Sequence, residues 1–224
     1  PYFGYARQDR KVAPRTSISA KVVSNLITNA GASRIVTVDL HAGQIQGFFD
    51  IPVDNLFTTP LFARYIKKKF KSKNLVCVSP DVGGVQRTRG LATKIKADLA
   101  IIDKRRPEPG KSKVMNIIGD VKGKNCIIID DIIDSGGTII NAVEALKKAG
   151  AIDVYVFITH AVLSGDAAEK IKKSKIKKLI ITDTIDNSLK IKNNSKIEVI
   201  SISPLMAEAI SRISNSTSVS DLFN

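Results

Sequence analysis

The chain has 224 residues, a formal net charge of +14 and a hydrophobic fraction of 43%. This length allows one large domain or two small ones, and the regular apolar runs indicate an ordered, globular protein. No run approaches the roughly 20 apolar residues of a membrane-spanning helix, and the chain opens with no signal-peptide pattern. The positive charge favours anionic partners: nucleic acid, acidic membranes or phosphorylated metabolites.

The distribution of side chains favours the last of these classes. Many lysines lie in diffuse clusters, such as residues 67–69 and 172–173, that are typical of solvated helix faces. With four Tyr, eight Phe and no Trp, few aromatic side chains can stack on bases. Cys77 and Cys126 lie among apolar neighbours without the spacing of metal ligands, which indicates buried, reduced thiols in a cytoplasmic protein. We therefore expect neither nucleic acid nor a membrane as partner.

Polar side chains occur at two places near the start of the chain. Arg7, Gln8 and Asp9 lie in a basic stretch that can contact phosphates, although the residues alone favour a solvated loop. A strand predicted over residues 34–40 ends at His41, and a turn is predicted after it. A histidine just past a strand end is a metal ligand, a phosphate contact or a structural residue, and the sequence leaves these three readings open.

A glycine-containing loop follows the strand predicted over residues 75–79. Its members are Asp81, Val82, Gly83 and Gly84. A carboxylate and two glycines before a helix form an anion-binding loop, although an ordinary turn between strand and helix has the same composition. A charge run over residues 104–113 follows the next predicted strand, residues 98–103. It reads either as a surface loop or as a lid over a polyphosphate.

The most informative stretch is residues 125–150. The apolar run 126–129 predicts a buried parallel strand that stops at Asp130 and Asp131. The loop after it contains Asp134, Ser135, Gly136, Gly137 and Thr138. A helical pattern then runs to Gly150. In this order of strand, glycine loop and helix, backbone N–H groups converge on an anion.

Strands and helices alternate along the chain, which predicts the α/β class with mainly parallel sheets. Helices are predicted from a cap at Ser17 or Ser19, from Thr58 or Thr59, and over residues 204–213. Further strands are predicted over residues 154–159, 178–182 and 196–201. Five predicted strand ends carry a polar residue: His41, Asp81, Asp103, Asp130 and His160. We expect these to form a site along one edge of the sheet system.

Together the motifs resemble ribose-phosphate diphosphokinase, the phosphoribosyl pyrophosphate synthetase family, over residues 2–223. The resemblance depends on YFGYARQDRK, VDLHAGQIQGFFDIPVDN, VSPDVGGVQRTRGLA, IIDKRRP, IIIDDIIDSGGTI and THAVLSG. It implies two phosphoribosyltransferase-like domains, the first one incomplete. It also implies transfer of the β,γ-diphosphoryl group of ATP to the C1 hydroxyl of ribose 5-phosphate, which gives phosphoribosyl pyrophosphate and AMP for nucleotide biosynthesis.

The resemblance also implies a division of the chain. Residues 1–58 would be the remainder of the amino-terminal domain, with the tail 205–224 packed on it, and residues 59–204 the second domain. The missing first segment would supply part of the adenine pocket, which leaves open whether the chain by itself is active.

Roles for individual residues follow from the same resemblance. ATP binding is implied for Arg7, Gln8, Asp9 and His41, and magnesium binding for His41 and Asp81. The pyrophosphate loop would be Asp81, Val82, Gly83 and Gly84. Ribose 5-phosphate would be bound by Asp130, Asp131, Asp134, Ser135, Gly136, Gly137 and Thr138. Lys104 and Arg106 would be the catalytic cations that close over the transferring group.

The implied cofactor is Mg2+, and the implied partners are ATP, ribose 5-phosphate and further copies of the chain in a homodimer or hexamer. ADP or phosphate would act as regulators, in a region that contains Asp54 and Asn55. Alternatives are a non-enzymatic synthetase-associated regulatory protein, a phosphoribosyltransferase and a nucleic-acid-binding protein. The first carries an insertion that residues 104–130 lack, and the second would not be expected to carry RQDRK or HAGQIQGFF.

Overall fold

The computed structural model describes residues 1–70, 74–105 and 114–223. The chain divides into two compact units, Pro1–Thr58 with Ser203–Asn224, and Thr59–Ile202. These limits are close to the division at residues 58 and 204 that the resemblance implies. That each unit is a phosphoribosyltransferase-like domain stays a prediction.

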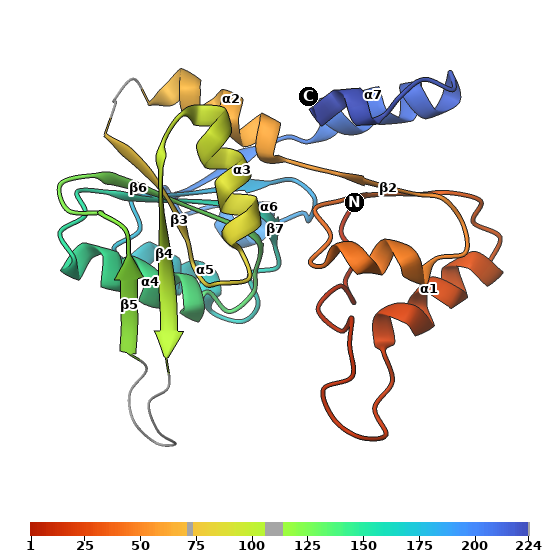
Figure 1. The fold of residues 1–224 in the computed structure, drawn as a ribbon, viewed down its shortest axis with the longest axis horizontal. Helices are drawn as coiled ribbons and strands as arrows, with labels where there is room; N and C mark the ends of the chain where they lie inside the picture. Colours follow the sequence, from red (N-terminus) through yellow and green to blue (C-terminus); the bar gives the residue numbers. More distant parts are fainter. Residues whose placement is uncertain (71–73, 106–113, 224) are drawn as a thin grey trace. The chain divides into compact units, whose positions relative to one another are not determined.

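The first unit is built around two short parallel strands. Its elements are α1 (Ser19–Asn29), β1 (Ile35–Val38), η1 (Gly43–Phe48), β2 (Val53–Leu56), α7 (Ser203–Ser214) and η2 (Ser220–Phe223). β1 pairs in parallel with β2 (Figure 1). Ala6, Leu40, Ile45 and Phe49 form a small buried cluster. The ring of Phe223 in the tail meets that of Phe57 edge-on, with 5.2 Å between centroids.

Three local predictions for this unit are wrong. The N-cap of α1 is Ile18, without a side-chain hydrogen bond, so neither Ser17 nor Ser19 caps the helix. The turn predicted after His41 is instead the 3-10 helix η1. The strand β2 was not predicted, because its four residues alternate too briefly to show a period.

The second unit contains a seven-stranded sheet. Its strands are β3 (Leu75–Ser79), β4 (Asp98–Arg105), β5 (Val114–Ile118), β6 (Asn125–Ile133), β7 (Val154–Ala161), β8 (Lys178–Thr182) and β9 (Ile197–Ile200). Its helices are α2 (Thr59–Lys69), α3 (Val85–Ile95), α4 (Gly137–Lys148), α5 (Ala167–Lys173) and α6 (Ser188–Ile191). The strand order is β5-β4-β3-β6-β7-β8-β9, and every pairing is parallel except that of β4 with β5. The predicted α/β class with a mainly parallel sheet is confirmed.

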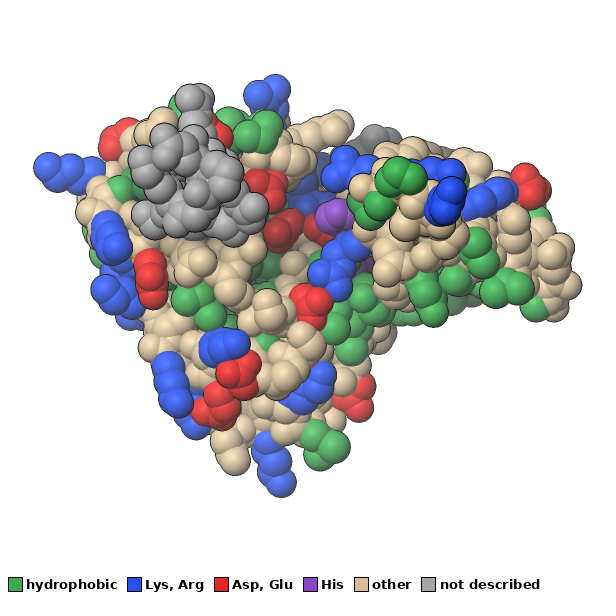
Figure 2. All heavy atoms as spheres, turned by 90° about the horizontal axis from the view of Figure 1, so that it is seen from below, with side chains coloured by type: hydrophobic (Ala, Val, Ile, Leu, Met, Phe, Trp, Pro, Cys, Tyr) green, Lys and Arg blue, Asp and Glu red, His purple; other side chains and the backbone are tan. Residues whose placement is uncertain are grey.

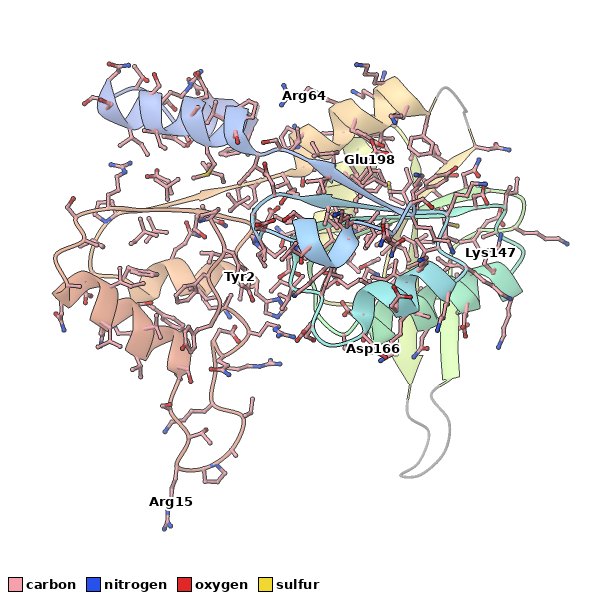
Figure 3. All side chains as sticks on the ribbon, turned by 180° about the vertical axis from the view of Figure 1, so that it is seen from behind. Tyr2, Arg15, Arg64, Lys147, Asp166 and Glu198 are labelled. Atoms are coloured by element: carbon pink, nitrogen blue, oxygen red, sulfur yellow. The ribbon has the colours of Figure 1, made fainter. Side chains whose placement is uncertain are left out.

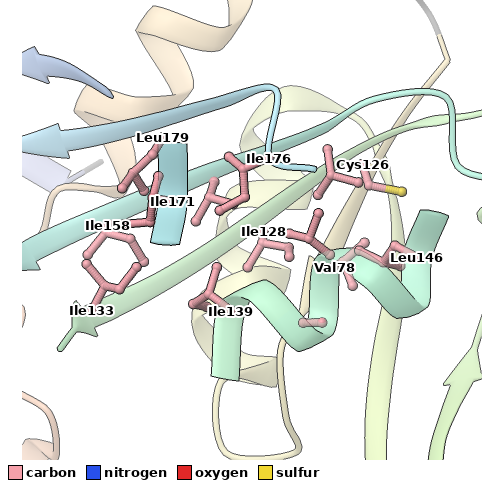
Figure 4. Packing of buried hydrophobic residues seen from close by; sticks show 14 of the residues in the cluster. Val78, Cys126, Ile128, Ile133, Ile139, Leu146, Ile158, Ile171, Ile176 and Leu179 are labelled. Atoms are coloured by element: carbon pink, nitrogen blue, oxygen red, sulfur yellow. The ribbon is translucent and has the colours of Figure 1, made fainter. Parts of the chain in front are cut away.

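Helices cover both faces of this sheet (Figure 1). Cys126 and Ile128 of β6 belong to a cluster with α4 and α5, part of which is drawn in Figure 4. Ile127 and Ile129 belong to a second cluster with α2 and α3. Because successive side chains of a strand point to opposite faces, a strand buried on both sides must be apolar throughout. This explains the unbroken run that predicted β6.

Three strands extend beyond their predicted ends. β6 continues to Ile133 and contains Asp130 and Asp131, while β7 contains His160, whose side chain is buried. Asp103 lies inside β4, where it faces Asn116 of the unpredicted antiparallel strand β5. The strands extend because neighbouring strands supply backbone partners where the local sequence has already become polar. Of the five polar residues expected at strand ends, His41 and Asp81 follow their strands.

The cysteines are confirmed as buried and free of disulfide bonds. Burial raises the pKa of both thiols to about 12, and the charge of Cys126 also contributes to the shift of Cys77. Among the described residues, no helix is long and apolar enough to cross a membrane. On the face shown in Figure 2, Lys and Arg side chains are scattered among Asp and Glu, as expected for solvated helix surfaces.

Candidate functional site

The loop at the end of β3 is closed by its own side chains. The hydroxyl of Ser79 donates to the carbonyl oxygen of Asp81 at 2.6 Å, and Asp81 Oδ1 accepts the N–H of Gly84 at 3.0 Å. A Cβ atom on Gly84 would lie 3.0 Å from Ser79 Oγ, which is too close without a shift. Glycine at this position therefore lets the turn close tightly before α3 begins.

The loop after β6 leads directly into α4. Gly136 is the N-cap of α4 and has a φ angle of +77°, in the left-handed region that favours glycine. Because the N-cap residue is a glycine, it offers no side chain of its own to the first N–H groups of the helix. Gly137 and Thr138 form the first turn of α4. The loop therefore has the geometry of an anion site at a helix N-terminus, as its composition predicted.

Arg87 joins the two loops. It lies in the first turn of α3, and its Nη1 atom donates to Oδ1 of Asp130 and to Oδ1 of Asp131, each at 3.0 Å. The side chain of Asp131 is 4% exposed, while those of Arg87 and Asp130 are about one-fifth exposed. Because β3 and β6 are hydrogen-bonded neighbours, the loops that follow them lie at the same edge of the sheet.

The two carboxyls titrate together. Burial raises the pKa of the Asp130 carboxyl to about 7, and the charge of Asp131 and a hydrogen bond to it add to the rise. The Arg87 guanidinium lowers the pKa but does not reverse the shift. The pair can thus both accept hydrogen bonds and donate one near neutral pH.

The amino-terminal candidates all lie in the first unit. Arg7 and Gln8 are exposed, and Asp9 Oδ2 accepts a hydrogen bond from Gln44 Nε2 at 2.7 Å. This bond attaches the basic stretch to η1, the helix that follows His41. His41 is exposed just beyond β1.

The backbone before His41 is held by buried polar groups. Asp39 is 4% exposed and has a φ angle of +42°, which is unusual for a residue with a side chain. Its Oδ2 atom accepts both the N–H and the hydroxyl of Thr58, and Asn55 Oδ1 accepts the N–H of Leu40. These contacts fix where the histidine leaves the strand.

Comparison with known proteins identifies the family. The profile of the phosphoribosyl synthetase-associated domain matches residues 107–224, and that of the N-terminal domain of ribose phosphate pyrophosphokinase matches residues 1–31. A ribose-phosphate pyrophosphokinase of Brucella melitensis is 60% identical over all 224 residues, which cover 72% of its length. This chain belongs to the ribose-phosphate pyrophosphokinase family.

Other relatives agree. The ribose-phosphate pyrophosphokinase of Rhizobium meliloti is 58% identical over the whole chain, which again covers 72% of that protein. The crystal structure of phosphoribosylpyrophosphate synthetase from Mycobacterium smegmatis superposes with a TM-score of 0.89 at 41% identity. That alignment covers 96% of this chain and 70% of the other. The fold and the family expected from the sequence are therefore confirmed.

The structure tests few of the residue roles that family resemblance implies. Arg87, in α3 just after the 81–84 loop, contacts Asp130 and Asp131, in β6 just before the 134–138 loop. Lys104 lies in β4, paired with Met115, but its side chain is not described, and Arg106 lies outside the described residues. In the parts of the chain that the structure describes, no group of three or more His, Cys, Asp or Glu side chains could hold a metal ion.

Two side chains in these arrangements were not predicted as site residues. Arg87 lies in the helix after the predicted glycine loop, and Gln44 lies in the turn predicted after His41, which is the helix η1 in the structure. Arg87 meets Asp131, 44 positions away, through pairing of β3 with β6, which no local pattern reveals. The sequence offered one signal for Arg87 as a site residue, its position three residues after the glycine pair Gly83 and Gly84.

Proposed function

We propose that this chain provides the sugar-phosphate and diphosphate sites of a ribose-phosphate diphosphokinase. The reaction transfers the β,γ-diphosphoryl group of ATP to the C1 hydroxyl of ribose 5-phosphate and gives phosphoribosyl pyrophosphate and AMP. The observation that carries the proposal is the link from Arg87 to Asp130 and Asp131, which joins two anion-binding loops on adjacent parallel strands. One loop suits the 5-phosphate of the acceptor sugar and the other suits the diphosphoryl group, which the reaction moves from ATP to the C1 hydroxyl.

Ribose 5-phosphate fits the loop after β6. The N–H groups at the start of α4, with the hydroxyls of Ser135 and Thr138, would hold the 5-phosphate. Asp130 and Asp131 would bind the ribose hydroxyls, since a pair that shares a proton can accept and donate hydrogen bonds. Binding of this kind orients the C1 hydroxyl for attack without any covalent intermediate.

ATP, the diphosphoryl donor, would be bound by the remaining candidate residues. Asp81, Val82, Gly83 and Gly84 would form the pyrophosphate loop, and Arg7, Gln8, Asp9 and His41 would bind ATP. Lys104 and Arg106 would neutralise the charge that develops on the transferred group. Phosphoryl transfer depends mainly on positioning and on charge neutralisation, so cations matter more than a strong base.

The chemistry of the proposed ligands, Asp81 and His41, fits Mg2+. This ion prefers oxygen ligands and keeps several waters, so one or two carboxylates and the substrate's own phosphates are enough to hold it. Asp81 binds its loop through Oδ1, which leaves Oδ2 for a metal, and His41 suits a metal-bound water or a phosphate. A bound Mg2+ would supply charge neutralisation at the phosphates. The small number of protein ligands agrees with a metal carried largely by ATP.

The test is AMP formation that depends on both ribose 5-phosphate and Mg2+. It should use a protein as long as the relatives, with this chain alone as a second sample, because the chain spans 72% of their length. AMP release in step with phosphoribosyl pyrophosphate is expected from the longer protein. Its absence there would refute the proposal. The proposal also places the enzyme in the cytoplasm. It expects a homodimer or hexamer, which light scattering would test. It expects regulation by ADP or phosphate, which the same AMP assay would test with these compounds added.

A further inference from the structure

A chain of hydrogen bonds leads from Lys190 in α6 to the last residue of β6. Lys190 Nζ lies 2.9 Å from the carbonyl oxygen of Val162. The same peptide group carries the N–H of Leu163, which lies 3.3 Å from the carbonyl oxygen of Ile133. That carbonyl belongs to the peptide group that carries the N–H of Asp134. Asp134 begins the loop 134–138, which is proposed to bind the 5-phosphate and is called the phosphate loop below. An ammonium group at one end polarises each peptide group along such a chain.

A second chain reaches the same carbonyl. Asn187, which is buried at the N-cap of α6, donates from Nδ2 to the carbonyl oxygen of Ala161 at 2.6 Å. The N–H of that peptide group, on Val162, donates to the carbonyl oxygen of Ile133 at 2.9 Å. The Ile133 carbonyl thus accepts two N–H groups, each from a peptide whose own carbonyl is held by a side chain at α6.

The loop between β7 and α5 also contacts the phosphate loop directly. The hydroxyl of Ser164 donates to Oδ1 of Asp134. Leu163, beside it, is fully buried and has a φ angle of +49°. A residue with a branched side chain adopts this conformation at a cost of about 1–2 kcal/mol, so it persists only where its surroundings hold it. The loop leads into Asp166 and α5, and Asp166 is labelled in Figure 3.

We infer that Lys190 and Ser164 are positioning residues for the phosphate loop, an inference that rests on the proposed function of that loop. Lys190 holds residues 162 and 163 and polarises the peptide of Asp134. Ser164 fixes the carboxylate of Asp134. A loop held in this way loses less conformational entropy when it binds a phosphate. Neither side chain needs to contact the substrate, so their loss weakens ribose 5-phosphate binding and leaves the chemical step intact.

Measurements of KM and kcat on variants of the complete enzyme test the positioning roles of Lys190 and Ser164. Lys190→Met removes the ammonium group and keeps the stem, and Lys190→Arg restores a charged donor. Lys192→Met is the matched control, because Lys192 is exposed in the same segment and makes no hydrogen bond among the described residues. We expect KM for ribose 5-phosphate to rise about tenfold in Lys190→Met and in Ser164→Ala, equivalent to about 1.4 kcal/mol. KM for ATP and kcat should stay within about twofold, and Lys190→Arg and Ser164→Thr should recover most of the loss.

Amide hydrogen exchange at residues 134–138, measured without substrates, gives a readout independent of activity. Exchange should be about fivefold faster in Lys190→Met and Ser164→Ala than in Lys192→Met. Equal exchange and equal KM in Lys190→Met and Lys192→Met would overturn the inference, as would faster exchange with an unchanged KM. Faster exchange in a protein that forms no AMP even without substitution would support the anchoring and refute the proposed function.

Discussion

Arg87 Nη1 lies 3.0 Å from Oδ1 of Asp131, a carboxylate whose side chain is 4% exposed. The two residues are 44 positions apart and come from α3 and β6. A carboxylate this deeply buried needs a charged or polar partner, because its desolvation is otherwise uncompensated. Arg87 therefore couples the stability of the second unit to the geometry of the two loops.

Replacing Arg87 with methionine should destabilise the protein, because the buried carboxyl of Asp131 and the half-buried carboxyl of Asp130 would lose their cation. We expect the free energy of unfolding at pH 7 to fall by about 2–3 kcal/mol, measured by urea denaturation. Arg89→Met is the control, since Arg89 is exposed in the same helix. Equal losses in the two variants would show that the ion pair contributes nothing beyond helix packing. Affinity for ribose 5-phosphate should also fall in Arg87→Met.

The raised pKa of Asp130 predicts an unusual pH dependence. The folded state binds the proton more tightly than the unfolded state, whose carboxyl has a pKa near 3.8. Stability from this group is therefore full below pH 3.8 and declines as the pH rises to about 7. Asp130→Asn removes this carboxyl, so the unfolding free energy of the variant should gain about 3 kcal/mol relative to the unsubstituted protein between pH 4 and pH 7. A constant difference across that range would contradict the shift.

Gly136→Ala should strain the phosphate loop. The φ angle of +77° costs an alanine about 1–2 kcal/mol. The nearest side-chain atoms would lie 3.7–3.9 Å from its Cβ, an ordinary contact distance, so the cost comes from the backbone and not from a clash. We expect a loss of that size in thermal or urea unfolding and weaker phosphate binding. Gly90→Ala provides the contrast, because Gly90 lies within α3 with open space around it. That variant should gain about 0.5–1 kcal/mol. A loss in both would point to a general intolerance of added methyl groups.

The catalytic role proposed for Lys104 and Arg106 gives a kinetic prediction. Lys104→Ala combined with Arg106→Ala should lower kcat of the complete enzyme by a factor on the order of 10²–10³, because charge on the transferred group would be left unneutralised. Binding of ribose 5-phosphate, measured by calorimetry, should be mostly retained. The double variant Lys172→Ala with Lys173→Ala removes the same charge from α5 and serves as control. Normal turnover of the first variant would refute the assignment.

Local chemistry in the sequence was enough to predict that a glycine loop joins strand to helix at residues 81–84 and 134–138, while anion binding by these loops stays a prediction. The glycines of 81–84 and 134–138 and the apolar runs before them are contiguous signals, and each loop lies where it was expected. The carboxyl ends of the strands were less predictable. Asp130 and His160 read as strand ends because the apolar runs stop there, but the strands continue to Ile133 and Ala161. Polar residues extend a strand when the neighbouring strand offers partners, and sequence spacing does not report that.

The sequence by itself determined the α/β class, the family and the composition of each loop, because these depend on residue types at short spacing. Tertiary structure alone decided how the loops are coupled. Arg87 reaches Asp130 and Asp131 only because β3 pairs with β6. Lys190 reaches Ile133 only through peptide groups of the β7–α5 loop. The first link depends on strand pairing and the second on loop and side-chain hydrogen bonds, and both join residues far apart in the chain, which no local pattern reports.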